Sequence, residues 1–210
     1  MILQQCHSKT FTKGHVPKIY VQYSTGRLYV DGVSLQTVPG LVRRAATEGY
    51  WEYDTSNCHW TILHQIAERE GVACLYIHEY LKNKIEIRNQ LAAQLSVSVS
   101  AIKKALLSLI YGAPLSRSPE VSLRDTLGEE AQTAFVEYPL IQNLYADIKI
   151  ASDVAISTCQ KRKQGYLNAA RKAIPLNSPR NKVLSHIVQG CEAAMLYAVL
   201  PLLTDVTVLQ

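Results

Sequence analysis

The chain has 210 residues, with 22 lysines and arginines against 17 aspartates and glutamates, so its formal net charge is +5 at pH 7. Hydrophobic residues make up 48% of the sequence, which provides for a sizeable core and excludes a globally disordered chain. No apolar run approaches the roughly 18–20 residues of a membrane-spanning helix, and no signal peptide is visible. We expect a soluble, cytoplasmic protein with no membrane partner, whose mild positive charge permits a nucleic-acid partner.

Five cysteines are scattered along the chain, and no two of them have the CxxC spacing of metal-binding or redox pairs. An odd number of such cysteines argues against a disulfide framework, and zinc ligands normally occur in tightly spaced pairs. We therefore predict reduced thiols rather than a zinc site at Cys6, Cys58, Cys74, Cys159 and Cys191.

The N-terminal segment predicts a β-hairpin. Residues 18–23 and 27–30 are rich in β-branched and aromatic side chains, and Ser-Thr-Gly at 24–26 separates them as a turn would. A further short strand is expected at 49–54, with Asp54 at its carboxyl end.

Two helical segments are expected next. Asp54 or Ser56 can cap a helix from about residue 57 to residue 70. Residues 76–111 are also helical in pattern, with an interruption in the serine-rich stretch that ends at Ser100, which we predict to be the N-cap of the second half. In that half Lys103, Leu107 and Tyr111 are spaced i, i+4, i+8, so they share one helix face.

The last third predicts mainly helix. Residues 113–131 are polar and contain proline, which is typical of a loop or short insertion. One long helix is expected from about 130 to 161 and a last helix from about 182 to 199, and Thr207 begins a strand. Strands, then helices, then a returning strand predict an α+β domain, with helices on one face of a small sheet and an inserted helical lobe.

Residues 159–182 contain no acidic residue. Such a tract suits contacts with the phosphates of a nucleic acid, although a solvated basic surface would have the same composition. Its seven basic residues are Lys161, Arg162, Lys163, Arg171, Lys172, Arg180 and Lys182.

Five blocks of sequence form an ordered set. They are Thr25–Leu28 with Leu35–Pro39, Asp54–Leu63, Lys103–Gly112, Phe135–Pro139, and Gln189-Gly190 with Ala193-Ala194. Each block alone is weak evidence for a function. In this order they resemble the family-A polymerases, which include the DNA polymerases of the polymerase I type and the phage-type single-subunit RNA polymerases. The blocks are similar to T-G-R-L…L-Q-x-[IV]-P, motif A, motif B (K-x7-Y-G), the F-x-x-Y-P helix and the Q-G-x-A-A helix that precedes motif C.

The resemblance implies a polymerase palm, which is a small antiparallel sheet backed by helices, with an inserted helical fingers lobe, no exonuclease domain and little or no thumb. Residues 1–60 would hold the N-terminal β region and the motif A strand. Residues 61–131 would form the fingers with motif B, and residues 132–210 the palm helices that lead to the motif C strand.

The resemblance also implies a reaction, which is the addition of nucleotides to a primer 3′ end by a two-metal mechanism. Asp54 would bind Mg²⁺, because hard oxygen ligands suit that ion. Lys103 would neutralise charge on the triphosphate and donate a proton to the leaving group. Tyr111 would close the base pocket by stacking. The partners would be a primer-template nucleic acid and nucleoside triphosphates.

Several positions depart from the family pattern around the nucleotide. His59 stands where the DNA polymerases have a glutamate that blocks the sugar 2′-hydroxyl, so the sugar preference stays open. Leu107 replaces a phenylalanine, as in the RNA polymerases. Val99 replaces a triphosphate-binding arginine, for which Lys104 could substitute. In the last helix, Glu192 lies inside the Q-G block.

Three side chains are expected at the nucleic-acid minor groove, where hydrogen-bond acceptors are common to all Watson–Crick pairs. They are Arg27, Gln36 and Gln189, and we expect Arg180 to contact phosphate. A polymerase-derived binding or assembly module without catalysis is the non-enzymatic alternative, and an unrelated helical scaffold is the third.

Thr207–Gln210 resembles the strand that leads into motif C, so the second metal-binding aspartate is expected beyond Gln210. A second chain or a C-terminal segment would then carry motif C. Asp205 precedes that strand and is more typical of a turn residue.

Overall fold

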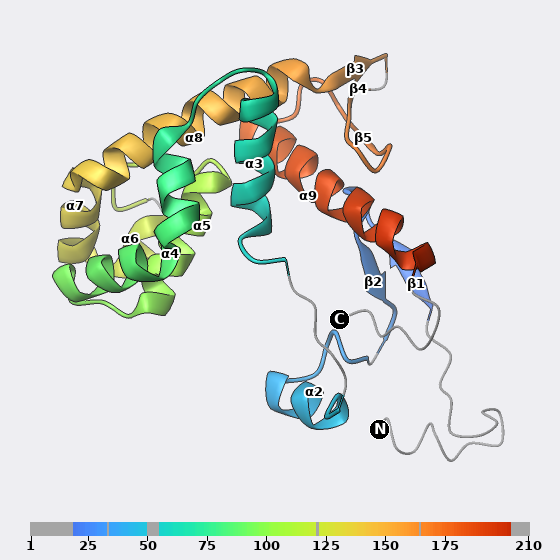
Figure 1. Cartoon of the computed structure of the whole chain (residues 1–210), viewed down its shortest axis with the longest axis horizontal. Helices are drawn as coiled ribbons and strands as arrows, with labels where there is room; N and C mark the ends of the chain where they lie inside the picture. The colour runs from blue at the N-terminus through green and yellow to red at the C-terminus, as the bar shows by residue number, and fades with distance from the viewer. Residues whose placement is uncertain (1–18, 33, 50–54, 121, 164, 203–210) are drawn as a thin grey trace.

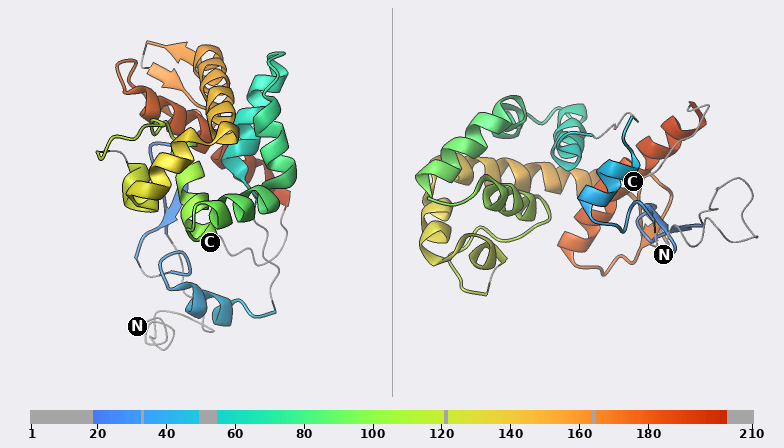
Figure 2. Two further views of the ribbon diagram at one scale, coloured as in Figure 1. Left: turned by 90° about the vertical axis from the view of Figure 1, so that its left-hand side faces the viewer. Right: turned by 90° about the horizontal axis from the view of Figure 1, so that it is seen from below.

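The computed structural model describes residues 19–32, 34–49, 55–120, 122–163 and 165–202 (Figure 1). It is an α+β protein, as predicted, with mostly helical structure and two small antiparallel sheets. The helices between Leu75 and Glu137 gather at one end of the long helix α8 (Pro139–Thr158), and the two small sheets lie toward its other end (Figures 1 and 2). The strands expected at 49–54 and from Thr207 fall almost entirely outside the described residues.

The predicted hairpin is confirmed. Strand β1 (Tyr20–Gln22) pairs with β2 (Leu28–Val30) in antiparallel register, with Tyr20 opposite Val30. Its turn is closed by the Gly26 N–H, which donates to the Tyr23 carbonyl at 2.9 Å. The short helix α2 (Gly40–Ala46) follows, with none of its residues buried.

The helix expected after residue 57 is confirmed as α3 (Cys58–Arg69), but its predicted cap is wrong. Asn57 occupies the N-cap position in the left-handed conformation, with φ of 53°, and makes no side-chain cap bond there. The Ser56 hydroxyl instead accepts a hydrogen bond from the Lys84 ammonium of α4 (Leu75–Gln94). The Ser56 hydroxyl therefore makes a tertiary contact with Lys84 and does not cap α3.

The interruption predicted before Ser100 is confirmed, because α4 ends at Gln94 and α5 spans Val99–Ile110. The N-cap of α5 is Ser98 rather than Ser100, and its hydroxyl accepts from the Ala101 N–H at 3.1 Å. Helix α5 ends in a Schellman motif at Tyr111, with Gly112 at φ of 85°.

Residues 113–131, predicted as a loop, contain α6 (Ser122–Leu127) and the start of α7 (Glu129–Glu137). Leu123 and Leu127 are buried in the core. Burial of these two leucines stabilises a helix of six residues that would be marginal in isolation.

The single helix predicted from 130 to 161 is wrong. Helix α7 ends at Glu137, and α8 begins at Pro139 and runs to Thr158. The residue before a proline is sterically disfavoured in the helical conformation, and Tyr138 is accordingly extended, with ψ of 120°. Pro139 itself is well placed at the first position of α8, where its missing N–H costs nothing.

Three strands that were not predicted lie in the basic tract. They are β3 (Gln160–Arg162), β4 (Gly165–Leu167) and β5 (Ala173–Ile174), in an antiparallel sheet. The predicted last helix is confirmed as α9 (Arg180–Val199), followed by the 3₁₀ turn η2 (Leu200–Leu202).

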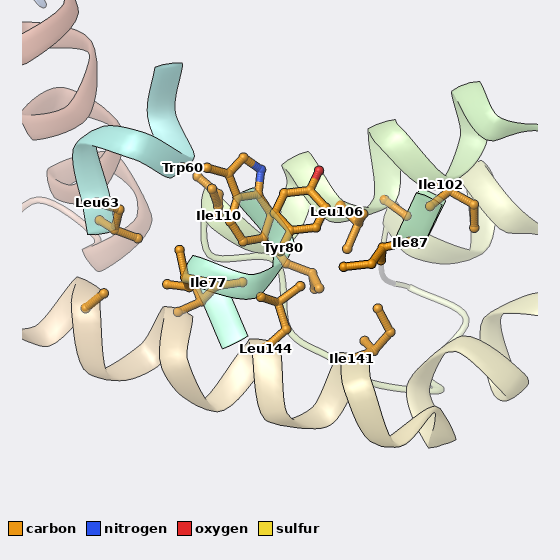
Figure 3. Packing of buried hydrophobic residues seen from close by; sticks show 14 of the residues in the cluster. Trp60, Leu63, Ile77, Tyr80, Ile87, Ile102, Leu106, Ile110, Ile141 and Leu144 are labelled. Atoms are coloured by element: carbon orange, nitrogen blue, oxygen red, sulfur yellow. The ribbon is translucent and has the colours of Figure 1, made fainter. Parts of the chain in front are cut away.

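Helix α8 forms one side of the hydrophobic core (Figure 3). It buries Ile141, Leu144, Ile148, Ala151 and Ala155, whose alternating spacing of three and four is that of one helix face. Helices α3, α4 and α5 cover this face, and the rings of Trp60 and Tyr80 pack at 4.4 Å between their centroids.

No single described helix is both long and apolar enough to cross a membrane, and α4 with α5 passes that test only as a pair bent by 112°.

Candidate functional site

Four side chains from distant parts of the chain meet in what we call the junction cluster, which consists of Arg27, His59, Tyr111 and Glu192. Arg27 Nε donates to Glu192 Oε2 at 2.9 Å, and His59 Nε2 lies 3.1 Å from the same oxygen. On the other side of the imidazole, the Tyr111 hydroxyl lies 2.5 Å from His59 Nδ1. The cluster thus joins the hairpin, α3, the end of α5 and α9.

Gly26 lets the hairpin turn lie close against Ala170, in the loop between β4 and β5, and beside Ala193 of α9, and so helps to place Arg27 at the cluster. A Cβ at this position would lie 2.5 Å from the Ala170 Cβ and 3.4 Å from the Ala193 Cβ, and its φ of 99° also favours glycine. The Tyr197 hydroxyl of α9 donates to the Gly26 carbonyl, and the Gln22 amide donates to Tyr197 at 2.6 Å. The glycine of the T-G-R-L block therefore has a packing role.

Gly190 has a similar role beneath Asn168. A Cβ on Gly190 would lie 2.3 Å from the Asn168 Cγ. The Asn168 amide donates to the carbonyls of Thr25, at 2.9 Å, and His186, at 3.1 Å, and so ties the hairpin to α9. Sequence reasoning missed Asn168, because a single asparagine in a polar segment has no distinguishing pattern.

The charges of the junction cluster balance one another. Burial alone would raise the pKa of Glu192, but hydrogen bonds from His59 and Arg27 outweigh burial and hold that pKa below its usual range. Burial opposes the charge of Arg27, yet the Glu192 carboxylate raises the Arg27 pKa. The Arg27 and Glu192 side chains are 28% and 37% exposed, so the pair lies at an accessible surface.

An open groove of about 730 Å³ lies beside the cluster. Its walls come from the hairpin turn, the β5 segment and the first half of α9. Tyr111 belongs to both the groove and the cluster, and burial is the main cause of its raised pKa. Polar residues that line the groove are Ser24, Thr25, Tyr111, Asn181, Lys182, Ser185, His186 and Gln189.

The sequence predicted that Lys103, Leu107 and Tyr111 share one face of α5, and in the structure much of this face is exposed. Lys103, Lys104 and Leu107 are exposed, and Tyr111 is half-buried at the end of the helix. The opposite face, which includes Ile102 and Leu106, is fully buried in the core. Neither lysine forms an ion pair within the described residues.

The remaining predicted residues lie elsewhere. The Gln36 amide oxygen accepts from the Val30 N–H at 2.8 Å and its NH2 group donates to the Leu28 carbonyl at 3.5 Å, so this side chain is bonded to the backbone of β2. Arg180 lies at the start of α9 and pairs with the exposed Asp153 at 2.6 Å. Asp54 lies outside the described residues.

Asp54, the expected magnesium ligand, lies outside the described part of the chain. Within it, no group of three or more histidine, cysteine, aspartate or glutamate side chains could hold a metal ion. Glu192 is the carboxylate of the junction cluster, and Arg27 and His59 already bind it.

Comparisons with models of protein families, with curated proteins and with solved structures found no match to this chain.

His186 of α9 makes stability depend on pH. Its side chain is buried, its Nε2 donates to the Lys172 carbonyl at 2.9 Å, and burial lowers its pKa in spite of backbone hydrogen bonds. Because the unfolded chain binds this proton more readily, the free energy of unfolding should fall as pH drops below about 6.5, by up to about 1.4 kcal/mol per pH unit. Urea unfolding between about pH 5 and 8 should show a shallower decline for His186→Gln than for the wild type.

The exposed His78 provides the matched control for this experiment. His78→Gln should leave the pH dependence of the wild type unchanged. Equal slopes for wild type and His186→Gln would contradict the assignment.

Proposed function

We propose that this chain forms the palm and fingers of a template-directed nucleotidyltransferase, a DNA polymerase of the family-A type that adds nucleotides to a primer 3′ end. The observation that carries the proposal is the junction cluster. Arg27, His59, Tyr111 and Glu192 come from four of the five blocks that resemble the family, and they meet although up to 165 residues separate them. His59 and Glu192 depart from the family pattern, so the support comes from the convergence of the four blocks and not from the identity of these two residues.

The arrangement of helices supports the same proposal. Helix α5, with Lys103, Leu107 and Tyr111 on its uncovered face, would be the nucleotide-facing helix of a fingers lobe formed by α4 to α7. The hairpin, α3, α8 and α9 would belong to the palm. The groove between the hairpin turn and α9 would receive the nucleic acid, with Gln189 at its wall.

The basic tract supports a nucleic-acid partner. Six of its seven basic residues are exposed, and within the described residues Arg180 alone of the seven forms an ion pair. Lys182 lines the groove itself. Unpaired cations next to a groove are what phosphate binding requires.

Magnesium would activate the primer hydroxyl and stabilise the leaving pyrophosphate. Asp54 is the residue we expect to bind it, on the resemblance alone. His59 leaves the choice between deoxyribonucleotides and ribonucleotides open, because both of its ring nitrogens already have partners in the junction cluster.

Primer extension tests the proposal. The full product of the coding sequence that contains these residues should extend a primer on a template with Mg²⁺, with deoxyribonucleotides and ribonucleotides supplied separately. Asp54→Ala should lower incorporation by about 10³-fold, because a bound metal contributes several kcal/mol to the transition state. Asp125→Ala, at an exposed position of α6, is the matched control and should retain activity.

The other outcomes separate the alternatives. Incorporation of ribonucleotides alone would identify an RNA polymerase. Salt-dependent duplex binding without incorporation would identify a non-catalytic binding module. Neither binding nor incorporation, or full activity in Asp54→Ala, would overturn the proposal.

A further inference from the structure

One oxygen atom organises the junction cluster. Glu192 Oε2 accepts from Arg27 Nε at 2.9 Å and also from Arg27 Nη2, and it lies 3.1 Å from His59 Nε2. Arg27 Nη2 in turn lies 3.2 Å from the same His59 nitrogen. His59 Nε2 therefore faces an obligate acceptor and an obligate donor at nearly equal distances.

This competition decides which nitrogen of His59 carries the proton. A carboxylate only accepts hydrogen bonds, so it favours a proton on Nε2. A guanidinium only donates, so it favours a bare Nε2 and a proton on Nδ1. Arg27 keeps two hydrogen bonds to Glu192, from Nε and Nη2, in either tautomer, whereas the carboxylate gains the His59 bond only when Nε2 carries the proton. The Nε2–H tautomer is thus the better fit to these contacts.

The tautomer determines the direction of the bond to Tyr111. With the proton on Nε2, Nδ1 is an acceptor and the Tyr111 hydroxyl must donate to it across 2.5 Å. With the proton on Nδ1, the hydroxyl would accept, and its hydrogen would be free to turn toward Gln189, which lines the groove and also interacts with this hydroxyl. The side chain that selects the tautomer therefore also sets the polarity of the Tyr111 hydroxyl at the groove wall.

We propose that Glu192 is the positioning residue of this site. It holds Arg27 and selects the Nε2–H tautomer of His59, and through His59 it fixes the hydroxyl of Tyr111 as a donor directed away from the groove. The effect on nucleotide binding rests on the proposed function, whereas the selection of the tautomer does not.

Nitrogen-15 NMR of the His59 imidazole tests the selection directly at about pH 8, where an ordinary histidine is neutral. The wild type should show a protonated Nε2 and a bare Nδ1. Glu192→Gln keeps the shape of the side chain and removes its charge, so Arg27 becomes free to donate to Nε2 and the proton should move to Nδ1. The resonances are assigned by their loss in His59→Asn.

Two controls keep the result decisive. Glu137→Gln removes the charge of an exposed pair with Arg117 and should leave the His59 spectrum unchanged. Tyr111→Phe removes the hydroxyl and should retain the Nε2–H tautomer, since Glu192 rather than Tyr111 selects it. If Glu192→Gln does not fold, the spectra of the wild type and of Tyr111→Phe still test whether His59 carries its proton on Nε2 independently of Tyr111. A wild-type proton on Nδ1, a tautomer that changes in Tyr111→Phe, or identical spectra for wild type and Glu192→Gln would overturn the proposal.

Primer extension then tests the link to nucleotide binding. Glu192→Gln should raise the KM for the incoming nucleotide about tenfold, the equivalent of one hydrogen bond, with a smaller change in kcat. A tautomer that moves while KM stays constant would contradict the link. A chain with no incorporation at all would contradict the proposed function and leave the NMR result standing.

Discussion

On the proposed function, replacing Lys103 by alanine is expected to lower the rate of nucleotide incorporation by about 10²–10⁴-fold, the range of a lost general acid. Lys103 is exposed on the face of α5 that also presents Leu107 and Tyr111. Eight residues separate it from Tyr111, which corresponds to about 12 Å along the helix. Its ammonium would balance the charge of the triphosphate and protonate the leaving pyrophosphate.

Single-turnover incorporation measures this effect, and thermal unfolding shows that the fold is kept. Lys103→Ala should unfold like the wild type, because the side chain forms no ion pair within the described residues and contributes nothing to the core. Lys82→Ala, at an exposed position of α4, is the control for loss of one positive charge. Equal rates in these two variants would exclude Lys103 from the reaction.

Gly190→Ala is expected to lower the free energy of unfolding by about 2–5 kcal/mol. The new methyl group would lie 2.3 Å from the Asn168 side chain, so the asparagine would have to move. That movement would break its bonds to the Thr25 and His186 carbonyls and to the Lys172 N–H, which lies at 3.0 Å. The free-energy cost of overpacking and the cost of leaving buried polar groups unpaired would add together.

Urea unfolding of the variant, followed by circular dichroism, measures the loss. Gly40→Ala is the matched control, because a Cβ at Gly40 would meet nothing within 4 Å and its φ is not in the left-handed region. It should be neutral or slightly stabilising, since alanine is the better helix former. A change below about 1 kcal/mol for Gly190→Ala would show that Asn168 does not fix the hairpin to α9.

Several local features followed from the sequence. The hairpin, α3, the α4–α5 break and α9 were predicted, because side-chain periodicity and turn residues act within a few positions of one another. The exposed face of α5 followed from the same periodicity. The break at Pro139 was also within reach, since proline restricts the residue before it, but the helical pattern on both sides concealed it.

The candidate site was predicted in part. Arg27, His59, Tyr111 and Gln189 were singled out as separate residues, and the structure brings them to one groove and the cluster beside it. In the structure Gln36 bonds to the backbone of β2 and Arg180 pairs with Asp153, so neither belongs to the cluster. The connection of Glu192 to Arg27 and His59 was not predicted.

The sequence by itself determined the α+β class, most of the helices and the chemistry available at each position. The tertiary structure decided which side chains meet. Residues 27 and 192 come together where Gly26 lies against Ala170 and Gly190 of α9 lies against Asn168, at distances that a Cβ on either glycine would prevent. Such contacts depend on packing between elements far apart in the chain, which short-range sequence patterns do not specify.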